Sequence, residues 1–268
     1  MHENIFYNGE IIFAESVLIG GLSMAALYGK GIFTTVAILD KKVFFWEKHW
    51  KRLERSAKAI RIDISEISEM ILKESLFEII NGNDCSFGRA RITIFDESPG
   101  AFWPFKTKRN TAVMITTADF SILPQNFRLT ISPYRINSVS PLTGIKCCNY
   151  LEKIIALNEA KDRGFDEAVC INERGEIASA VMANIFWLKD GKLFTPPLET
   201  GCLAGTTREY ILENTDCFES REGVELICSA DDVFLTSAGI GVVRVAEIDG
   251  RKLAMSSHEI FSLVPRSE

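Results

Sequence analysis

The sequence lacks the long apolar runs that a membrane-spanning helix needs, because Lys, Asp or Glu interrupts each run well before roughly 20 residues. We therefore expect no association with a membrane. Residues 1–4 show no basic start followed by an apolar stretch, so we expect no secretory signal and a cytoplasmic location. Internal repeats and low-complexity tracts are also lacking, so a repeat architecture is not expected.

The seven cysteines form no C-x-x-C pair and no cluster with the three histidines. This pattern predicts reduced thiols, with neither disulfides nor a zinc site, so no metal is expected. We interpret the adjacent Cys147 and Cys148 as small buried residues. A reactive thiol at this pair is the alternative interpretation.

Acidic residues outnumber basic ones, with 36 Asp and Glu against 30 Lys and Arg and a formal charge of −6. An excess of negative charge disfavours nonspecific binding to nucleic acid or to an anionic membrane, so neither partner is expected. Hydrophobic residues make up 47% of the 268-residue chain, which allows a substantial core in one large domain or in two.

Turn residues and apolar spacing predict the order of the structural elements. Asn-Gly at 8–9 and Asp-Gly at 190–191 each separate two apolar runs and predict tight hairpins. Apolar residues at alternating spacings of four and three predict an amphipathic helix over 46–60. The other expected elements are a hairpin over 36–45, a helix over 65–80, strands over 89–95, 111–117 and 127–134, a helix over 149–163 and a helix that opens at 205–208.

A linker is predicted at about 119–126, where Pro124 and Asn126 interrupt any regular pattern. It separates an N-terminal domain of residues 1–120 from a larger C-terminal domain of residues 127–268. Strands and helices are mixed without strict βα alternation, so the predicted fold class is α+β with two domains.

The segment 144–152 reads GIKCCNYLE and resembles the cofactor-lysine segment of the class IV pyridoxal-phosphate enzymes, with the aminodeoxychorismate lyase branch as the closest match. Four further segments agree in order and rough spacing: YGKGIFTT at 28–35, HWKRL at 49–53, MANIFW at 182–187 and GTTR at 205–208. The resemblance implies fold type IV, as in D-amino acid aminotransferase, with a small N-terminal α/β domain and a larger C-terminal domain of mixed, barrel-like sheets and helices. It also implies pyridoxal 5'-phosphate as the cofactor and a homodimer.

By this resemblance, Lys146 carries the cofactor as a Schiff base. Taken alone, Lys146 would be interpreted as a solvated surface residue. The chemistry requires an amine whose pKa is low enough to attack an aldehyde, and apolar neighbours lower that pKa by disfavouring the ammonium form. Ile145, Cys147 and Cys148 supply such neighbours. Once released, the same amine can move a proton at the substrate carbon.

The cofactor phosphate needs several hydrogen-bond donors and a positive field, and a helix N-terminus provides both. The resemblance assigns this role to the N–H of Thr206 and the hydroxyl of Thr207, with Arg52 as an ionic partner. A second phosphate loop is expected at 236–239, where Ser237 is a substitute for the family's usual threonine.

Two further positions bear on the cofactor ring. Tyr150 resembles the tyrosine that hydrogen-bonds the ring hydroxyl, and an ordinary core tyrosine is the alternative. Ser179 stands where the family has a glutamate that keeps the pyridine nitrogen protonated. A hydroxyl cannot stabilise a pyridinium as a carboxylate does, and Glu176 would point to the opposite face of a strand. The ring would be a weaker electron sink, which favours elimination over transamination.

These observations predict a lyase resembling aminodeoxychorismate lyase, which converts 4-amino-4-deoxychorismate to 4-aminobenzoate and pyruvate in folate precursor synthesis. Its small amino substrate is a dicarboxylate, for which Arg89, Arg91 and Arg135 are candidate ligands. The alternatives are a branched-chain or D-amino acid aminotransferase, and a cofactor-binding scaffold with little turnover.

Overall fold

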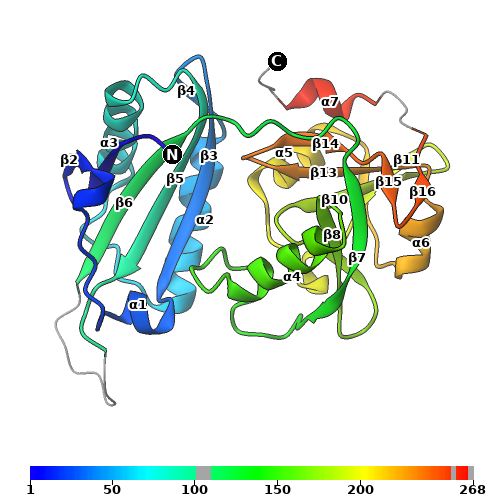
Figure 1. Cartoon of the computed structure of the whole chain (residues 1–268), viewed down its shortest axis with the longest axis horizontal. Coiled ribbons are helices and arrows are strands. Elements are labelled where there is room, and N and C mark those ends of the chain that lie inside the picture. Colours follow the sequence, from blue (N-terminus) through cyan, green and yellow to red (C-terminus); the bar gives the residue numbers. More distant parts are fainter. Residues whose placement is uncertain (101–109, 255–257, 265–268) are drawn as a thin grey trace. The chain divides into compact units, whose positions relative to one another are not determined.

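The computed structural model describes residues 1–100, 110–254 and 258–264 (Figure 1). These residues form two compact units. Unit 1 comprises Met1–Phe120 together with Ile145–Asn149, and unit 2 comprises Ser121–Gly144 and the described chain from Tyr150 onward. Within the described ranges, no helix is long and apolar enough to cross a membrane.

Unit 1 contains a six-stranded antiparallel sheet in the order β2-β1-β6-β5-β3-β4. Its strands are β1 (Asn4–Tyr7), β2 (Glu10–Phe13), β3 (Gly31–Leu39), β4 (Lys42–Val43), β5 (Phe87–Asp96) and β6 (Thr111–Ala118). Its helices are η1 (Ala14–Ser16), α1 (Met24–Tyr28), α2 (Trp46–Ile60) and α3 (Glu69–Gly82). The longest strands, β3 and β5, pair along their lengths and form the centre of this unit.

The turn at Asn8-Gly9 confirms the predicted N-terminal hairpin. Asn8 and Gly9 have positive φ angles of 47° and 99°, as a two-residue hairpin turn requires. The hairpin of β3 and β4 is also present, but β4 ends at Val43 and not at the predicted residue 45. Phe45 adopts a left-handed φ of 56° and leads directly into α2, so it cannot continue the strand.

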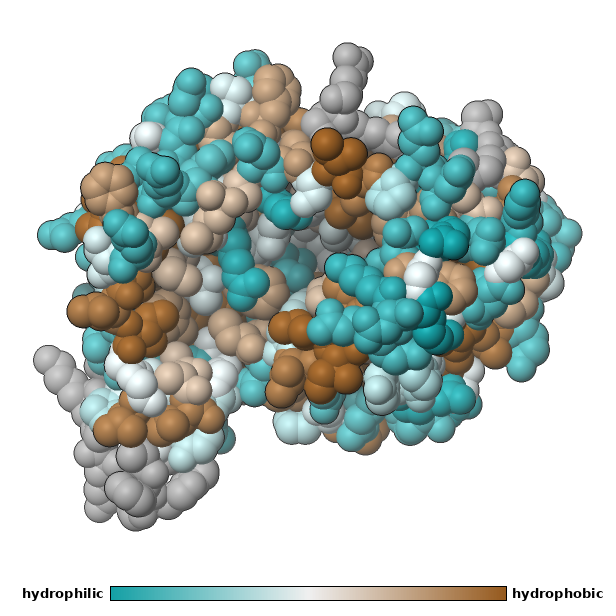
Figure 2. All heavy atoms as spheres, in the orientation of Figure 1, coloured by the Kyte–Doolittle hydropathy of each residue, from teal (hydrophilic) through white to brown (hydrophobic). Residues whose placement is uncertain are grey.

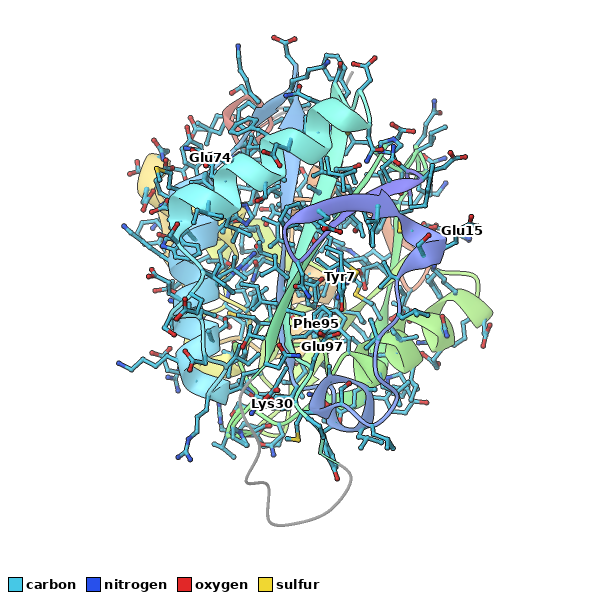
Figure 3. All side chains as sticks on the ribbon, turned by 90° about the vertical axis from the view of Figure 1, so that its left-hand side faces the viewer. Tyr7, Glu15, Lys30, Glu74, Phe95 and Glu97 are labelled. Carbon is cyan, nitrogen blue, oxygen red and sulfur yellow. The ribbon has the colours of Figure 1, made fainter. Side chains whose placement is uncertain are left out.

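Helices α2 and α3 cover one face of this sheet. In Figure 3, α3 (cyan) crosses in front of the strands and α2 (light blue) lies to their left. The predicted apolar stripe of α2 is confirmed, because Trp46 and Trp50 are buried against the strands. Helix α3 begins later than predicted, at Glu69. The reason is its cap: the side chain of Ser68 accepts a hydrogen bond from the N–H of Ile71 at 3.2 Å.

The alternation of side chains along β3 and β5 separates the two faces of the sheet. Ile32 and Val36 of β3, and Ile92 of β5, face the helices and are fully buried. The intervening residues, among them Phe33 and Arg91, therefore face the opposite side.

Two polar contacts fix the start of β3 and the end of β5 (Figure 3). The hydroxyl of Tyr7 donates a hydrogen bond to Oε1 of Glu97 at 2.6 Å, and Lys30 forms an ion pair with Asp96 at 2.8 Å. Burial and the Glu97 carboxylate raise the pKa of Tyr7 to about 12. The phenol therefore keeps its proton and remains a donor.

Unit 2 contains two five-stranded mixed sheets, in the orders β12-β11-β10-β13-β14 and β16-β15-β7-β8-β9. Its strands are β7 (Arg128–Ile136), β8 (Glu167–Asn172), β9 (Ile177–Ala180), β10 (Asn184–Lys189), β11 (Lys192–Thr195), β12 (Cys217–Glu219), β13 (Asp232–Ser237), β14 (Gly241–Arg244), β15 (Glu247–Ile248) and β16 (Arg251–Lys252). Its helices are α4 (Leu151–Asp162), η2 (Leu198–Thr200), α5 (Thr206–Asn214), α6 (Val224–Ser229) and α7 (Ile260–Leu263).

The core of unit 2 has two layers because β10 and β13 are buried on both faces. Ile185, Trp187 and their neighbours on β13 pack into a cluster shared by the two sheets. Phe186 and Phe234 point the other way and pack with residues of α5 and α7. Burial on both faces explains why 233–235 reads as an unbroken apolar run.

The sequence placed residues 127–268 in one domain, whereas residues 145–149 belong to unit 1. Backbone pairing explains the difference: the N–H of Phe33 donates to the carbonyl of Lys146 at 2.8 Å, and the N–H of Cys148 donates to the carbonyl of Gly31 at 2.8 Å. Residues 119–127 contain no strand or helix. That the two units are separately folding domains joined by a linker at about 119–126 stays a prediction.

We expect Gly31→Ala to lower the free energy of unfolding by about 1–3 kcal/mol, the usual cost of overpacking. A methyl group at Gly31 would lie 2.8 Å from Sγ of Cys148 and 2.9 Å from Cβ of Phe95. Chemical denaturation would measure the change. Gly20→Ala is the matched control, because a methyl group there meets nothing within 4 Å; equal stability of the two variants would contradict the expectation.

Candidate active site

Lys146 projects from the short segment that pairs with β3 in unit 1. Its Nζ lies 4.6 Å from the centre of the Phe33 ring, and its side chain is half-buried. Phe33 itself is buried, and its N–H binds the Lys146 carbonyl. The amine therefore lies against an aromatic ring whose position the backbone fixes.

Arg91 approaches the same ring. Its guanidinium carbon lies 3.6 Å from the ring centre of Phe33, and its Nε donates to Oγ1 of Thr93 at 3.2 Å. The thiol of Cys148 interacts with this guanidinium, but burial outweighs the cation and raises the pKa of the thiol. A protonated thiol is a poor nucleophile, and Cys147 beside it is buried, so both fit the interpretation as small packing residues.

Arg52 belongs to a buried polar network between α2 and β3. Its guanidinium donates to Oγ1 of Thr34 at 2.6 Å, and the same oxygen lies 2.6 Å from Nδ1 of His49. All three side chains are buried, and His49 is 0% exposed. Thr34 and His49 were not singled out as site residues by sequence reasoning, although the pattern HWKRL spaces His49 and Arg52 onto one side of the helix.

This network fixes the protonation state of His49. Desolvation, and then the positive charges of Arg52 and Lys146, lower the pKa of His49 well below its ordinary value, so the imidazole is neutral. The Arg52 guanidinium only donates, and it lies 3.4 Å from Nδ1 of His49 as well as 2.6 Å from Oγ1 of Thr34, so Nδ1 is the acceptor and the Thr34 hydroxyl donates to it. His49 therefore carries its proton on Nε2, and the Arg52 guanidinium is held in one orientation.

In unit 2, the predicted helix start at 205–208 is confirmed as the N-terminus of α5. Gly205 is the cap residue, and no side chain caps the helix. Thr206 and Thr207 are both buried, and the Thr207 hydroxyl has no hydrogen-bond partner among the described residues. The helix N-terminus thus presents a buried hydroxyl and a positive dipole end to any anion.

Asn184 and Thr236 adjoin this helix start. A methyl group at Gly205 would lie 2.0 Å from Oδ1 of Asn184, so only glycine allows this approach. Thr236 is the direct strand partner of Asn184, and its hydroxyl is buried without a partner in the described part of the chain. Sequence reasoning chose Ser237 in this loop, but Ser237 is half-exposed and the buried, unsatisfied hydroxyl belongs to Thr236.

Ser179 lies on β9 opposite Cys170 of β8, and it is buried. Neither nearby acid supplies a free carboxylate at this position. Glu176 accepts hydrogen bonds from Asn172 at 2.8 Å and from Arg174 at 2.7 Å. The carboxylate of Glu167 accepts hydrogen bonds from the backbone N–H groups of residues 168, 181 and 182. Neither carboxylate is therefore available to take the place of the glutamate that Ser179 replaces.

The remaining predicted residues lie on β5, on β7 and directly before α4. Arg89 is two residues from Arg91 on β5, so both face the same side of unit 1, and Arg89 pairs opposite Ala37. Arg135 lies on β7 of unit 2, is exposed and follows a register irregularity in the pairing with β8. Tyr150 directly precedes α4 and is half-buried.

A family model described as class IV aminotransferase matches residues 31–248. The chain belongs to the class IV aminotransferase family. A branched-chain-amino-acid aminotransferase of Escherichia coli (strain K12) is 28% identical over 265 residues, which are 92% of this chain and 85% of the relative. The aminodeoxychorismate lyase of Bacillus subtilis (strain 168) is 24% identical over 267 residues, which are 96% of this chain and 91% of the relative.

Among solved structures, the branched-chain aminotransferase of the archaeon Thermoproteus uzoniensis aligns with a TM-score of 0.88 and 26% identity, covering 96% of this chain and 91% of that one. The predicted fold class is thereby confirmed: the class IV chain has the α+β architecture of fold type IV enzymes. Another branched-chain aminotransferase of this fold was solved with pyridoxamine 5'-phosphate. The chain is a class IV enzyme that uses pyridoxal 5'-phosphate, so the predicted cofactor is confirmed as well.

The residues present fit this cofactor. An aldehyde needs a lysine amine in partly desolvated surroundings, and Lys146 lies half-buried over Phe33. A phosphate needs donors and positive charge, and the N-terminus of α5 carries the unsatisfied hydroxyl of Thr207. Thr236 adds a second unsatisfied hydroxyl on the strand next to Asn184. These hydroxyls could hold a phosphate without breaking any hydrogen bond in the protein.

Proposed function

We propose that this class IV enzyme is a lyase that splits 4-amino-4-deoxychorismate into 4-aminobenzoate and pyruvate. The C–H bond beside the substrate nitrogen and the C–O bond to the enolpyruvyl group break, the ring becomes aromatic, and the released enol takes up a proton as pyruvate. Every atom of the substrate ends in one of the two products. The reaction therefore needs no second substrate, unlike transamination.

In this proposal, Lys146 binds the cofactor covalently and moves the proton. Bound pyridoxal 5'-phosphate supplies an aldehyde for amines and a ring that accepts electrons. The Lys146 amine removes the proton from the substrate carbon that bears the nitrogen. Its position over the buried ring of Phe33 limits the access of water.

The same proposal assigns the remaining cofactor contacts. The N–H of Thr206 and the hydroxyls of Thr207 and Thr236 bind the phosphate, with Ser237 beside them. Arg52 contributes positive charge in the single orientation that Thr34 imposes. Tyr150 binds the ring hydroxyl, and Ser179 lies at the pyridine nitrogen.

Ser179 is the observation that favours a lyase over an aminotransferase. A serine hydroxyl donates one hydrogen bond to an unprotonated pyridine nitrogen, whereas a pyridinium needs a carboxylate. Glu176 and Glu167 are engaged by other groups and supply none. A weak electron sink suffices for an elimination, because the electron pair leaves with the departing oxygen.

The second candidate is a branched-chain or D-amino acid aminotransferase. It is favoured by the relative of Escherichia coli that carries the name branched-chain-amino-acid aminotransferase, and by Tyr150. In that reaction the enzyme would pass an amino group to an oxo acid. A third candidate, a cofactor-binding scaffold with little turnover, predicts cofactor binding without either reaction.

We further propose a homodimer with a small amino acid-type substrate. Leu151, Ile154 and Ile155 of α4 are 68%, 46% and 45% exposed, and their spacing places them on one stripe of the helix. A hydrophobic patch lies over this helix in Figure 2. Exposed apolar stripes of this kind are typical of interfaces, which sedimentation velocity would test.

We expect the purified holoenzyme to form 4-aminobenzoate and pyruvate in equal amounts from 4-amino-4-deoxychorismate without any added oxo acid. Chromatography and a coupled pyruvate assay would measure the products. In Lys146→Ala the rate should fall by at least about 10²–10⁴-fold, because the acid–base group is lost. Borohydride should label the peptide that contains Lys146. Transfer of the amino group to an oxo acid without release of pyruvate would refute the lyase proposal.

We expect Thr207→Val to weaken pyridoxal 5'-phosphate binding by about 10–100-fold, the loss of one hydrogen bond to a charged group. The unfolding free energy of the apoprotein should not fall, because the hydroxyl has no partner among the described residues. Thr236→Val should behave alike. Thr195→Val is the contrast: that buried hydroxyl donates to the Ile185 carbonyl at 2.9 Å, so stability should fall by about 1–3 kcal/mol. Cofactor titration and denaturation separate these effects.

We expect Ser179→Glu to raise the rate of half-transamination by at least about tenfold, equivalent to about 1.4 kcal/mol of barrier. A carboxylate at this position would keep the pyridine nitrogen protonated and strengthen the electron sink. Ser179→Gln is the matched control, since it has the same size without the charge. Single-turnover absorbance would follow the reaction, and an unchanged or slower transamination in Ser179→Glu would count against the electron-sink explanation.

A further inference from the structure

The turn between β9 and β10 joins two residues of the candidate site. Ser179 lies on β9 and Asn184 begins β10, with the turn at 180–183 between them. A backbone hydrogen bond of 3.0 Å closes this turn. Asn184 is tied to the segment before α5, because its side-chain amide donates to the carbonyl of Leu203 at 2.8 Å. The conformation of the turn therefore affects where Ser179 lies relative to the N-terminus of α5.

The carboxylate of Glu167 binds the backbone of this turn. Its Oε1 accepts from the N–H of Val181 at 3.1 Å, and its Oε2 accepts from the N–H of Met182 at 3.1 Å. The side chain comes from the start of β8, and Glu167 is only 5% exposed. A buried carboxylate is costly unless donors surround it, so these backbone N–H groups and the carboxylate depend on each other.

Lys153 of α4 binds the same turn at its carbonyl. Its Nζ donates to the carbonyl of Val181 at 3.0 Å, so Glu167 holds the N–H of this residue while Lys153 holds its carbonyl. Burial raises the pKa of Glu167, and the backbone hydrogen bonds and the charge of Lys153 oppose that rise. Two side chains of opposite charge, from a strand and from a helix, thus fix one turn.

A ligand that is bound at both ends needs its two sets of contacts at a fixed separation. In the proposed site, Ser179 lies at the pyridine nitrogen, whereas Thr207 and Thr236 bind the phosphate. The ring and the phosphate of the cofactor are joined covalently, so a wrong separation between the two sets weakens binding of the whole molecule. A fragment that meets only one set is not affected in this way.

We propose that Glu167, together with Lys153, is a positioning residue that sets the separation between the ring contacts and the phosphate contacts of the cofactor site. The inference rests on the cofactor contacts given under the proposed function, but it holds for either reaction. Glu167 acts through the turn at 180–183 and does not touch the cofactor. A residue that only stabilised the fold would not distinguish the whole cofactor from its fragments.

The test measures how the full-length apoprotein binds pyridoxal 5'-phosphate, pyridoxal and inorganic phosphate. In Glu167→Gln we expect binding of pyridoxal 5'-phosphate to weaken by about 10–100-fold, with the affinities for pyridoxal and for phosphate unchanged. The amide keeps the size of the carboxylate, but its NH2 group opposes the N–H of Met182, where the carboxylate accepts. Absorbance titration follows the two aldehydes, and phosphorus NMR follows inorganic phosphate.

Variants of Lys153 provide a second measurement. Lys153→Met removes the donor to the Val181 carbonyl and should show the same selective loss, whereas Lys153→Arg keeps a charged donor and should bind like the wild type. Lys153 also lies 5.8 Å from the centre of the Tyr150 ring, so Glu167→Gln is the primary variant. Lys161→Met on α4 and Glu225→Gln on α6 change exposed residues and are the matched controls.

The outcomes separate this inference from the function on which it rests. Equal weakening of all three ligands in Glu167→Gln indicates a general structural role and overturns the inference, as does unchanged binding of pyridoxal 5'-phosphate. Selective weakening of the whole cofactor supports it, even in an enzyme that forms no pyruvate, a result that refutes the lyase function alone. Near-ultraviolet circular dichroism shows whether each variant is folded, and Lys153→Met decides by the same comparison if Glu167→Gln is not.

Discussion

The two backbone hydrogen bonds between the start of β3 and residues 146–148 are the constraint on which the active site depends. They hold the carbonyl of Lys146 and the N–H of Cys148 against Gly31 and Phe33. The pairing places the lysine side chain over an aromatic ring that is itself buried. A lysine in a free loop would lose this position and would be more hydrated. Local strand pairing thus fixes the position of the Lys146 amine.

Buried hydroxyl groups fall into two kinds in this protein, and the difference separates scaffold from ligand site. Thr34 is satisfied on both sides, by Arg52 and by His49, and acts as a rigid support. Thr207 and Thr236 are equally buried but have no partner among the described residues. An unsatisfied buried hydroxyl costs about 1–3 kcal/mol, which a bound phosphate would recover. A buried hydroxyl without a hydrogen-bond partner therefore indicates a position where a ligand is expected to bind.

Local chemistry explains why much of the fold was predictable from the sequence. The turn residues Asn8-Gly9 fix a backbone conformation within two residues. The apolar spacing of α2 can likewise be recognised within a short stretch of sequence. Helix α3 begins later than predicted because the side chain of Ser68 accepts a hydrogen bond from the N–H of Ile71 and caps the helix there. Thr236 was missed because burial of a hydroxyl depends on the strand beside it. The contact between Arg91 and Phe33 depends on the register between β3 and β5, which no local pattern encodes.

The distribution of charge explains how a protein with a net negative charge can bind an anionic cofactor and substrate. The whole chain carries a formal charge of −6, which repels polyanions at long range. Within unit 1, however, Lys146, Arg91 and Arg52 are all held near β3. Burial first, and then the positive charges of Arg52 and Lys146, lower the pKa of His49. Screening leaves the field of these charges effective only over a few ångströms. A small anion that reaches the site is therefore attracted.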